Sequence, residues 1–595
     1  MRMRGWWGGI PCIPTPPQQS PATLSAQIFP HRQTVGLLPQ QTNKHTLSRS
    51  LALVNDWLLP YPKMSTAAGA LSSPLVTGLL GLGVGALAYS LFSKAEQQQH
   101  ASAHATGADS AAASSSSGGG LQLPLPLRTT KHNPSLDTET LNRKQSLKDA
   151  EFAGKRVLMR VDYNVKIKGG KVVDATRITS TIPTLKQILH PAEGVEPCKC
   201  VVLITHLGRP AGNINVKEYT VQPICAVLRD HLPGIDVQFL PDCVGEEIEA
   251  ATKNCKPNTL FLCENLRFHP EETGLRVITK PDGSVEKQRS TFAEKVAFRK
   301  GLSRLGDIFV FEAFGAAHRP HASVIGIDLP QRVAGLLMHK EMSFYGRVLS
   351  KPARPFVAII GGAKVSDKIL VLENLLTNVL VEGDSMIIGG GMAYTFLRII
   401  SNVSIGESLF DAEGAGVVHR IVEKARERGI KIHLPVDHII GDKFGADARI
   451  GVTDNARGIP SKWMGLDIGP KTRSQNSDVI ARARTVLWNG PLGVYELGPF
   501  GGGTIAAFWD LVSATASGAT TIIGGGDTGS ASKFFFVGNK AVSESVSHVS
   551  TGGGSSLVLM EGKLLPAVGA LSDIGDNSRP KPPNEADELD ADEDD

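Results

Sequence analysis

Short apolar runs recur along the chain from about residue 146 onward, and glycine or a polar side chain follows most of them. Seven of these runs start at Arg156, Val201, Thr259, Phe356, Ser385, Thr485 and Thr520. They are rich in Val, Ile and Leu and too short for helices, which is typical of strands. Because they are continuously apolar rather than alternating, they predict strands buried on both faces, as in parallel sheets.

Helical patterns lie between the predicted strands. The clearest covers residues 411–429, where one helical face collects the apolar residues Val417, Val418, Ile421, Val422 and Ala425. Gly429 is a suitable C-terminal stop for this helix. Strands that alternate with such helices predict an α/β fold with parallel sheets. The patterned region of about 430 residues exceeds the usual size of one domain, so we expect two domains.

The first part of the chain lacks this pattern. Residues 1–63 are basic and almost free of acids, which is typical of a targeting peptide and equally of a disordered leader. Residues 64–93 carry no charge and are long enough to span a bilayer, so they are either a membrane anchor or the apolar part of a signal that is later removed. Residues 94–145 are predicted to be a flexible linker rich in Ala, Ser and Gly. These features favour an organelle-targeted or membrane-associated protein over a plainly cytoplasmic one.

Composition narrows the class of protein. With 41% hydrophobic and 20% charged residues, the 595-residue chain is globular in character. Its 63 glycines follow no collagen-like period, so they indicate close backbone approaches instead. The net charge of +4 includes an acidic tail, predicted to be disordered over residues 576–595, so the remainder is basic and suits anionic ligands. The seven cysteines match neither a disulfide framework nor a paired zinc motif, and we expect buried, reduced thiols.

Anion-binding side chains follow the early predicted strands. This set comprises Asp162, Asn164, Arg177, His206, Arg209, Arg267, His318 and Arg319. One arginine at a strand end is usually a solvated charge, but several facing one cleft would be costly without an anion to neutralise them. Guanidinium groups match phosphate and carboxylate bidentately. The first half therefore predicts a small, multiply anionic substrate, with Asp162 and Asn164 left to bind its hydroxyl group.

Glycine-rich turns follow the later predicted strands. No Walker A motif occurs, but residues 361–368 combine two glycines with Lys364 and Lys368 after a strand, and three further turns lie at residues 389–391, 524–528 and 550–554. A single triple-glycine is usually a tight strand-to-helix turn, whereas four glycine-rich turns in one half-chain favour backbone donors for nucleotide phosphates. Asp527 could hold Mg²⁺ through water beside such phosphates.

Together these motifs closely resemble those of phosphoglycerate kinases, a family of glycolysis and the Calvin cycle. The matching stretches, in the family's order, are RVDYN, HLGRP, ENLRF, FGAAHR, GGAKVSDK, GGGMAYTF, LPVD, WMGLDIGP, WNGPLGV, IIGGGDT and SHVSTGGG. The resemblance implies two Rossmann-like domains with parallel sheets facing across a hinged cleft. It places an N-terminal domain at 146–335, completed by 560–575, a hinge helix at 336–350 and a C-terminal domain at 351–559.

The resemblance also implies a reaction: reversible phosphoryl transfer from 1,3-bisphosphoglycerate to MgADP, giving 3-phosphoglycerate and MgATP, by a monomer that binds no nucleic acid. It assigns phosphoglycerate binding to Asp162, Asn164, Arg177, His206, Arg209, Arg267 and Arg319. It assigns nucleotide binding to Lys364, Lys368, Gly390, Asn489, Pro491, Glu496, Gly525, Gly526, Asp527 and Thr528, with Asp527 on Mg²⁺ and Glu496 on the ribose. Arg177, Lys364 and Gly525 are implied to act on the transferring phosphoryl group.

The sequence departs from the family pattern at a few positions. Phe311, Glu312 and Ala316 replace an Asn, an Asp and a Thr, and Lys166 replaces a proline. None of these changes removes a predicted catalytic group, so we expect activity. The alternative is a catalytically dispensable, membrane-tethered scaffold on the same fold, which the N-terminal extension motivates and the intact set of arginines and lysines opposes.

Overall fold

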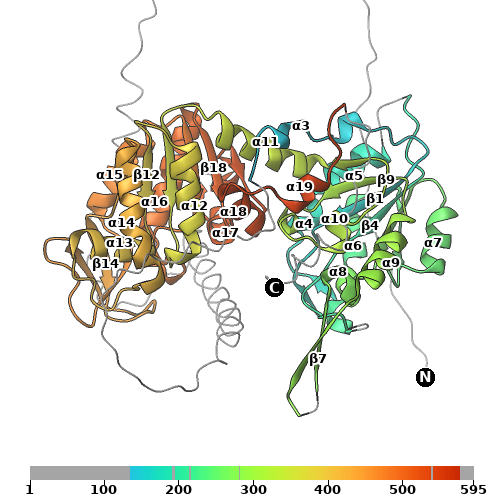
Figure 1. Ribbon diagram of the computed structural model, residues 1–595, viewed down its shortest axis with the longest axis horizontal. Helices are drawn as coiled ribbons and strands as arrows, with labels where there is room; N and C mark the ends of the chain where they lie inside the picture. Colours follow the sequence, from blue (N-terminus) through green and yellow to red (C-terminus); the bar gives the residue numbers. More distant parts are fainter. Residues whose placement is uncertain (1–134, 191–193, 214–215, 281, 538–539, 576–595) are drawn as a thin grey trace, which may run out of the picture. The chain divides into compact units, whose positions relative to one another are not determined.

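The computed structural model describes residues 135–190, 194–213, 216–280, 282–537 and 540–575 (Figure 1). All of them belong to one compact unit, Val84–Asp595. The predicted leader, the apolar segment 64–93, most of the predicted linker and the acidic tail lie outside the described residues. Within the described ranges, no helix combines the length and the apolar character that crossing a bilayer requires.

The first half of the fold is built on a six-stranded parallel sheet with the order β10-β9-β1-β4-β6-β5. Its strands are β1 (Arg156–Val161), β4 (Cys200–Ile204), β5 (Asp236–Leu240), β6 (Thr259–Cys263), β9 (Ile308–Glu312) and β10 (Arg332–Ala334). Its helices are α4 (Thr176–Thr179), α5 (Ile182–Leu189), α6 (Ile224–His231), α7 (Glu246–Lys253), α8 (Pro270–Thr273), α9 (Phe292–Ser303) and α10 (Ala322–Ile325). We call this part the N-terminal lobe.

The second half, the C-terminal lobe, has its own six-stranded parallel sheet with the order β13-β12-β11-β17-β18-β21. Its strands are β11 (Phe356–Ile360), β12 (Ser385–Ile388), β13 (Lys431–His433), β17 (Thr485–Asn489), β18 (Thr520–Gly524) and β21 (His548–Val549). An antiparallel sheet adds β14 (Asp437–Gly441), β15 (Ile450–Asp454) and β16 (Met464–Ile468). The helices are α12 (Ile369–Asn374), α13 (Met392–Ser401), α14 (Ala412–Glu427), α15 (Pro470–Ile480), α16 (Gly502–Ala516), α17 (Gly526–Phe534) and α18 (Gly554–Met560).

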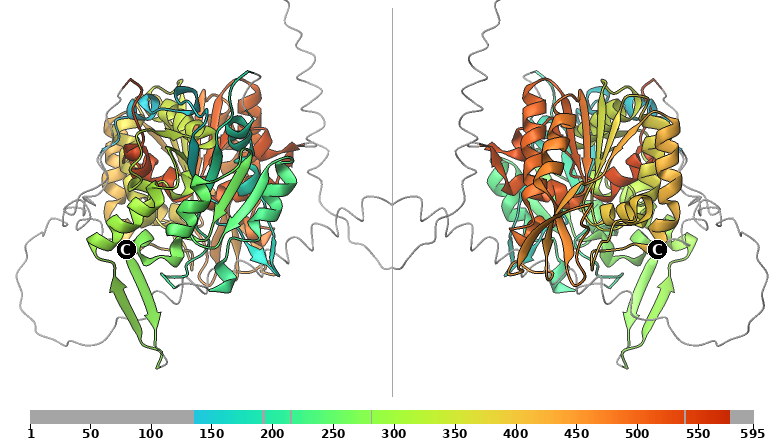
Figure 2. Two further views of the ribbon diagram at one scale, coloured as in Figure 1. Left: turned by 90° about the vertical axis from the view of Figure 1, so that its right-hand side faces the viewer. Right: turned by 90° about the vertical axis from the view of Figure 1, so that its left-hand side faces the viewer.

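Three two-stranded ribbons complete the strands. They pair β2 (Ile167–Lys168) with β3 (Lys171–Val172), β7 (Leu275–Thr279) with β8 (Val285–Arg289), and β19 (Phe536–Val537) with β20 (Lys540–Ala541). Figure 2 shows the β7–β8 hairpin projecting beyond the N-terminal lobe.

Both parallel sheets are covered on two faces, as the continuous apolar runs predict. Along β1, Leu158 faces one hydrophobic core, while Val157 and Met159 face another on the opposite side of the sheet. In β11, Ile360 and Ile359 divide in the same way between two cores. This alternation confirms the predicted α/β fold class with two parallel sheets.

Helix α11 (Leu336–Ser350) connects the two lobes. One hydrophobic core includes residues of the first sheet, residues of the second sheet, and Met338, Met342 and Tyr345 of this helix. Because one apolar cluster continues through α11, a shift of this helix would change the side-chain packing of both lobes.

The predicted linker is wrong at its C-terminal end. Residues 140–143 form α3 (Thr140–Arg143), and Leu141 is only 3% exposed. Leu141 stands alone in a polar stretch and produces no periodic pattern, so its burial against α11 is not visible in the sequence. At the other end, α19 (Pro566–Ala570) contacts the N-terminal lobe, where the Ala567 amide donates to the Ala317 carbonyl at 3.1 Å.

Candidate active site

A cavity of about 510 Å³ is lined by residues of both lobes and of α11. From the N-terminal lobe it receives Asp162, Arg177 and Glu312, and from the C-terminal lobe Gly525 and Gly553. Asp162 and Gly525 directly follow β1 and β18, Glu312 ends β9, and Gly553 follows the edge strand β21. The cavity therefore lies at the carboxyl ends of strands of both sheets, where ligands bind in open α/β sheets. The cavity thus brings together parts of the two predicted binding sets.

Arg177 is held at the cavity by a carboxylate. Asp162 directly follows β1, and Arg177 lies in the short helix α4. Its Nη1 donates to both oxygens of Asp162, at 2.9 and 2.8 Å. The Arg177 side chain remains 48% exposed while that of Asp162 is 14% exposed, so the guanidinium is oriented yet still reachable by a ligand.

His206 sits on a buried network that the sequence analysis does not identify. Nη2 of Arg160, which is fully buried in β1, lies 2.9 Å from His206 Nδ1. Burial first, and then the Arg160 charge, lower the pKa of His206 well below its ordinary value. The imidazole is therefore neutral, and because Arg160 can only donate, Nδ1 accepts and the proton lies on Nε2.

The charge of Arg160 has an internal partner. The Glu272 carboxylate lies 3.9 Å from Arg160 Nη2 and accepts hydrogen bonds from the Ser323 amide and hydroxyl at 2.9 and 2.6 Å. A buried guanidinium needs such pairing, because an isolated charge in the interior is very costly. The pair holds Arg160 in place beside His206.

Arg267 experiences strong positive crowding. It lies in the 3₁₀ turn η3 (Leu266–Phe268), and its Nη1 donates to the Gly208 carbonyl at 2.8 Å. Burial lowers the pKa of Arg267 to about 10, and the nearby guanidinium groups of Arg160, Arg319 and Arg209 act in the same direction. Its Nε is buried without a protein partner. An anion bound here would relieve both the repulsion and the unpaired donor.

The remaining residues predicted to bind phosphoglycerate lie around this cluster. Asn164 accepts a hydrogen bond from the Gly208 amide through Oδ1, at 3.0 Å. Arg209 is exposed after β4, and Arg319 is half-buried beyond the 3₁₀ turn η4 (Phe314–Ala316). His318 contacts the other lobe, with its Nδ1 2.9 Å from Ser555 Oγ.

The glycine turns of the C-terminal lobe need glycine for two different reasons. Gly390, between β12 and α13, has φ +66°, and a Cβ there would lie 2.6 Å from the Gly362 carbonyl oxygen. Gly525, between β18 and α17, has φ +84°. Left-handed backbone favours glycine at both positions, and close packing excludes a side chain at Gly390. At the start of α17 Gly526 is exposed, which suits phosphate binding, whereas the Gly390 amide already donates to the Leu492 carbonyl at 3.2 Å.

Side chains predicted to bind the nucleotide form hydrogen bonds that link the ends of neighbouring strands. Lys368, which ends the 3₁₀ turn η5 (Ser366–Lys368), donates from Nζ to Asn489 Oδ1 at the end of β17. Burial lowers the pKa of Lys368, while the Asp367 and Asp527 carboxylates act against that change. The Gly490 amide donates to Thr528 Oγ1 in α17 at 3.0 Å.

Other residues predicted to bind the nucleotide are exposed to solvent or form hydrogen bonds through their backbone atoms. Lys364 and Asp527 are exposed, as is Glu496 in the 3₁₀ turn η7 (Tyr495–Leu497). The Tyr495 hydroxyl reaches the Asp527 carbonyl oxygen at 3.3 Å, which joins this turn to α17. The Pro491 carbonyl accepts from the Gly362 amide at 3.1 Å. The structure therefore places all ten predicted nucleotide residues at the carboxyl edge of one sheet.

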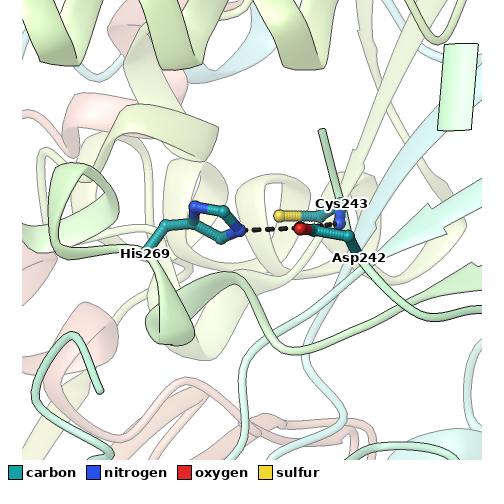
Figure 3. Close-up of side chains that lie close together, drawn as sticks. All are labelled: Asp242, Cys243 and His269. Atoms are coloured by element: carbon teal, nitrogen blue, oxygen red, sulfur yellow. Dashed lines mark hydrogen bonds and ion pairs between the residues drawn. The ribbon is translucent and has the colours of Figure 1, made fainter. Parts of the chain in front are cut away.

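Three potential metal ligands lie close together outside this cavity (Figure 3). His269 Nε2 is 2.7 Å from Asp242 Oδ1, and Cys243 lies beside them. Burial raises the pKa of the Cys243 thiol well above its ordinary value, so the thiol is protonated. We interpret the Asp242–His269 contact as structural, because it ties the loop after β5 to the start of α8.

The residues missed by the sequence analysis share one property. Arg160, Glu272 and Glu312 are charged but buried, and each contacts other protein groups, although Glu312 also lines the cavity. Arg160 lies inside the RVDYN stretch, so a charged residue within an otherwise apolar strand is the signal that could have revealed it.

Comparison with known proteins agrees with this geometry. The model of the family described as phosphoglycerate kinase matches residues 147–563. The chain is 50% identical to a phosphoglycerate kinase of Schistosoma mansoni over 430 residues, 72% of this chain and 99% of that protein. It is 47% identical to one from Saccharomyces cerevisiae over 436 residues, 73% of this chain and 99% of that protein. The solved phosphoglycerate kinase of Coxiella burnetii matches with a TM-score of 0.60 at 33% identity, covering 71% of this chain and 98% of that one. The chain therefore belongs to the phosphoglycerate kinase family.

Proposed function

We propose that this protein is an active phosphoglycerate kinase, a phosphotransferase whose acceptor is a carboxyl group. It transfers a phosphoryl group reversibly between 1,3-bisphosphoglycerate and MgADP, giving 3-phosphoglycerate and MgATP. The observation that carries the proposal is the shared cavity, which Arg177 and Asp162 line from one lobe and Gly525 and Gly526 from the other.

In this proposal the N-terminal lobe binds phosphoglycerate. The crowded cations around Arg267 bind its phosphate and carboxylate groups, since guanidinium groups match both bidentately. Neutral His206, with its proton on Nε2, donates a hydrogen bond rather than a charge. Asp162 and Asn164 bind the hydroxyl group, and Asp162 also orients Arg177.

The C-terminal lobe binds the nucleotide in this proposal. The turns at Gly390 and Gly525, with Lys368, contact the phosphates, and the Glu496 carboxylate binds the ribose hydroxyls. The exposed Asp527 carboxylate at the start of α17 is a fitting Mg²⁺ ligand, because magnesium in nucleotide sites uses one or two carboxylates together with phosphates and water. When bound, the ion neutralises charge on the phosphate oxygens.

For this reaction the protein must position the reactants and neutralise the charge on the transferring phosphoryl group. In the direction of ATP formation, the bond between the phosphoryl group and the carboxyl oxygen breaks, and a bond to the terminal oxygen of ADP forms. Arg177 from one lobe and Lys364 from the other neutralise the transferring group, and no covalent enzyme intermediate is needed. Because the two cations belong to different lobes, closure through α11 aligns the reactants and excludes water.

A coupled assay tests the activity. The full-length protein is given 3-phosphoglycerate and MgATP, and the 1,3-bisphosphoglycerate formed is reduced by glyceraldehyde-3-phosphate dehydrogenase with oxidation of NADH. We expect NADH oxidation that requires both substrates and that Lys364→Ala reduces on the order of 10²–10³-fold. A wild-type protein without activity dependent on 3-phosphoglycerate would contradict the proposal and favour a non-catalytic scaffold.

We also propose that residues 1–93 direct this monomer to an organelle or a membrane. The basic, acid-poor stretch 1–63 and the uncharged stretch 64–93 support this proposal. Mass spectrometry of the mature N-terminus tests it: a start beyond residue 92 indicates a removed signal, and a retained apolar segment indicates an anchor. An intact N-terminus on a protein that fractionates without membranes or organelles would contradict both.

A further inference from the structure

Three cysteines gather at the amino-terminal edge of the first sheet, away from the cavity. Cys198 precedes β4, Cys200 begins it, and Cys255 lies in the connection between α7 and β6. Strands β4 and β6 are parallel neighbours with Cys200 opposite Thr259, so this connection reaches the sheet beside the first residue of β4. All three are free thiols; Cys198 and Cys200 are buried as predicted, whereas Cys255 is half-buried.

The contact between Cys200 and Cys255 is very short. Their Sγ atoms are 2.9 Å apart, and Cys255 is the donor of this contact. A disulfide bond is about 2.05 Å long and needs Cβ atoms about 3.5–4.5 Å apart, so the sulfurs are within about 1 Å of bonding distance. The Thr252 carbonyl oxygen, 3.9 Å from Cys200 Sγ, places the last turn of α7 against the same pair.

A cationic residue lies on the neighbouring strand, where Arg156 of β1 pairs with Cys200 of β4. Negative charge on the Cys200 or Cys255 sulfur raises the pKa of Arg156. Burial first, and then the adjacent Cys255, raise the pKa of Cys200, while the Arg156 guanidinium acts against both. The guanidinium is itself fixed by Asp307, with Nη2 and Oδ1 2.6 Å apart. Arg156 therefore opposes but does not cancel the rise in the pKa of Cys200, so the first attack on an external disulfide falls to the more exposed Cys255.

The two thiols differ in access to solvent. Cys200 is fully buried, whereas Cys255 is half-buried in its loop. An external oxidant therefore meets Cys255 first, and Cys200 is placed to react with whatever forms on it. Cys198 is 3% exposed, and the sulfur in contact with Cys255 is that of Cys200, so Cys200 rather than Cys198 is placed to pair with Cys255.

We propose that Cys200 and Cys255 form a disulfide site that is filled by exchange with a small-molecule disulfide such as glutathione disulfide. The Cys255 thiolate attacks one sulfur of glutathione disulfide, which forms a mixed disulfide and releases one glutathione thiolate. The Cys200 thiolate then attacks the Cys255 sulfur, forming the Cys200–Cys255 bond and releasing the second glutathione. Two protein thiols are oxidised, one disulfide is reduced, and the two thiol protons end on two glutathione molecules.

The cross-link joins β4 to the chain entering β6 and closes a long loop through α6, β5 and α7. Such a loop restricts the unfolded chain more than the folded one, so the disulfide stabilises the N-terminal lobe. The bond lies at the amino end of β4, whereas His206 follows its carboxyl end. We therefore expect greater thermal stability with unchanged kinase activity.

Peptide mapping tests the site directly. The full-length protein is incubated with glutathione disulfide or with a reductant, its remaining thiols are alkylated under denaturing conditions, and it is digested with trypsin without reduction. Lys199 separates Cys198 from Cys200 on digestion, so the two are distinguished. We expect a cross-link between the peptide starting at Cys200 and the peptide containing Cys255, assigned to Cys255 rather than Cys263 by fragmentation. A cross-link through Cys198 instead, or none, would overturn the proposal.

Thermal unfolding supplies the second measurement. Oxidation should raise the Tm of the lobe by on the order of 5–10 °C, and reductant should reverse the shift. Cys255→Ser should lose both the cross-link and the shift while keeping wild-type activity. The matched control Cys225→Ser, a buried thiol in α6, should keep both. An equal shift in oxidised Cys255→Ser would overturn the proposal.

Discussion

At the residue scale, the cavity is organised by charged side chains that fix one another. Asp162 accepts hydrogen bonds from Nη1 of Arg177, so the other guanidinium nitrogens stay available to a ligand. One layer deeper, Arg160 fixes the tautomer of His206. In both cases a neighbouring charged group determines which atoms of the binding residue remain available to a ligand, which is typical of preorganised sites.

Arg177→Ala should lower kcat on the order of 10²–10³-fold, because it removes one preorganised charge from the transferring phosphoryl group. KM for 3-phosphoglycerate should change less than kcat does. Steady-state kinetics with varied 3-phosphoglycerate measure both. Arg457→Ala, an exposed arginine of the C-terminal lobe, is the matched control and should retain wild-type kcat. A kcat for Arg177→Ala within about twofold of wild type would remove the residue from the chemical step.

His318 should make stability depend on pH. Burial first, and then Arg319, lower its pKa from 6.5 to about 4. Below pH 6.5 the unfolded chain gains a proton that the folded chain does not, so this contribution to stability is complete above 6.5 and is lost as the pH falls toward 4. The free energy of unfolding of wild type relative to His318→Gln should fall by up to about 1.4 kcal/mol per pH unit in that window. Urea unfolding at several pH values measures it, and parallel curves for the two proteins would contradict it.

At the element scale, α11 is anchored from both lobes. Glu312, at the end of β9, accepts hydrogen bonds from the Leu337 and Met338 amides at 3.0 and 3.1 Å and from the Thr184 hydroxyl. Glu341 in the middle of the helix contacts His548 Nε2 and accepts from the Thr551 amide, both at 2.7 Å. The helix start is thus tied to the N-terminal lobe and its middle to a glycine turn of the C-terminal lobe.

Glu312→Ala should lower the free energy of unfolding by about 2–3 kcal/mol, because it leaves buried donors at the start of α11 unsatisfied. Glu312→Gln retains one acceptor oxygen and should cost less. Chemical denaturation compares the two with Glu413→Ala, an exposed acid in the first turn of α14, which should remain within about 0.5 kcal/mol of wild type. If Glu312→Ala were no less stable than Glu413→Ala, the capping role would be wrong.

The elements predicted from sequence are those with a local signal. The run at Phe356 is a strand over Phe356–Ile360, and the helix expected within 411–429 spans Ala412–Glu427. Burial of Leu141 and the cap formed by Glu312 depend on partners far along the chain, so no local pattern reports them. Arg177 and Lys364 could be assigned roles from the resemblance alone. Arg160 acts through His206, and only the structure shows that contact.

At the scale of the whole molecule, both ends of the described chain close on the N-terminal lobe. Lys144 Nζ pairs with the Asp573 carboxylate at 3.0 Å and donates to the Leu571 carbonyl at 3.0 Å. Gln145 Nε2 donates to the Asp573 carbonyl, also at 3.0 Å. Residues 135–145 therefore fasten the C-terminal segment that follows α19.

Two truncated chains distinguish the contribution of residues 135–145 from that of the preceding extension. A chain that begins at Ser135 should keep wild-type kcat and Tm, because the described fold and the family match both lie after that point. A chain that begins at Ser146 loses the buried Leu141 and the Lys144–Asp573 pair, so its Tm should fall by about 5–10 °C. Scanning calorimetry with the coupled assay measures both properties. Equal melting temperatures would show that residues 135–145 contribute nothing to stability, whereas a loss of activity in both chains would give the extension a catalytic role.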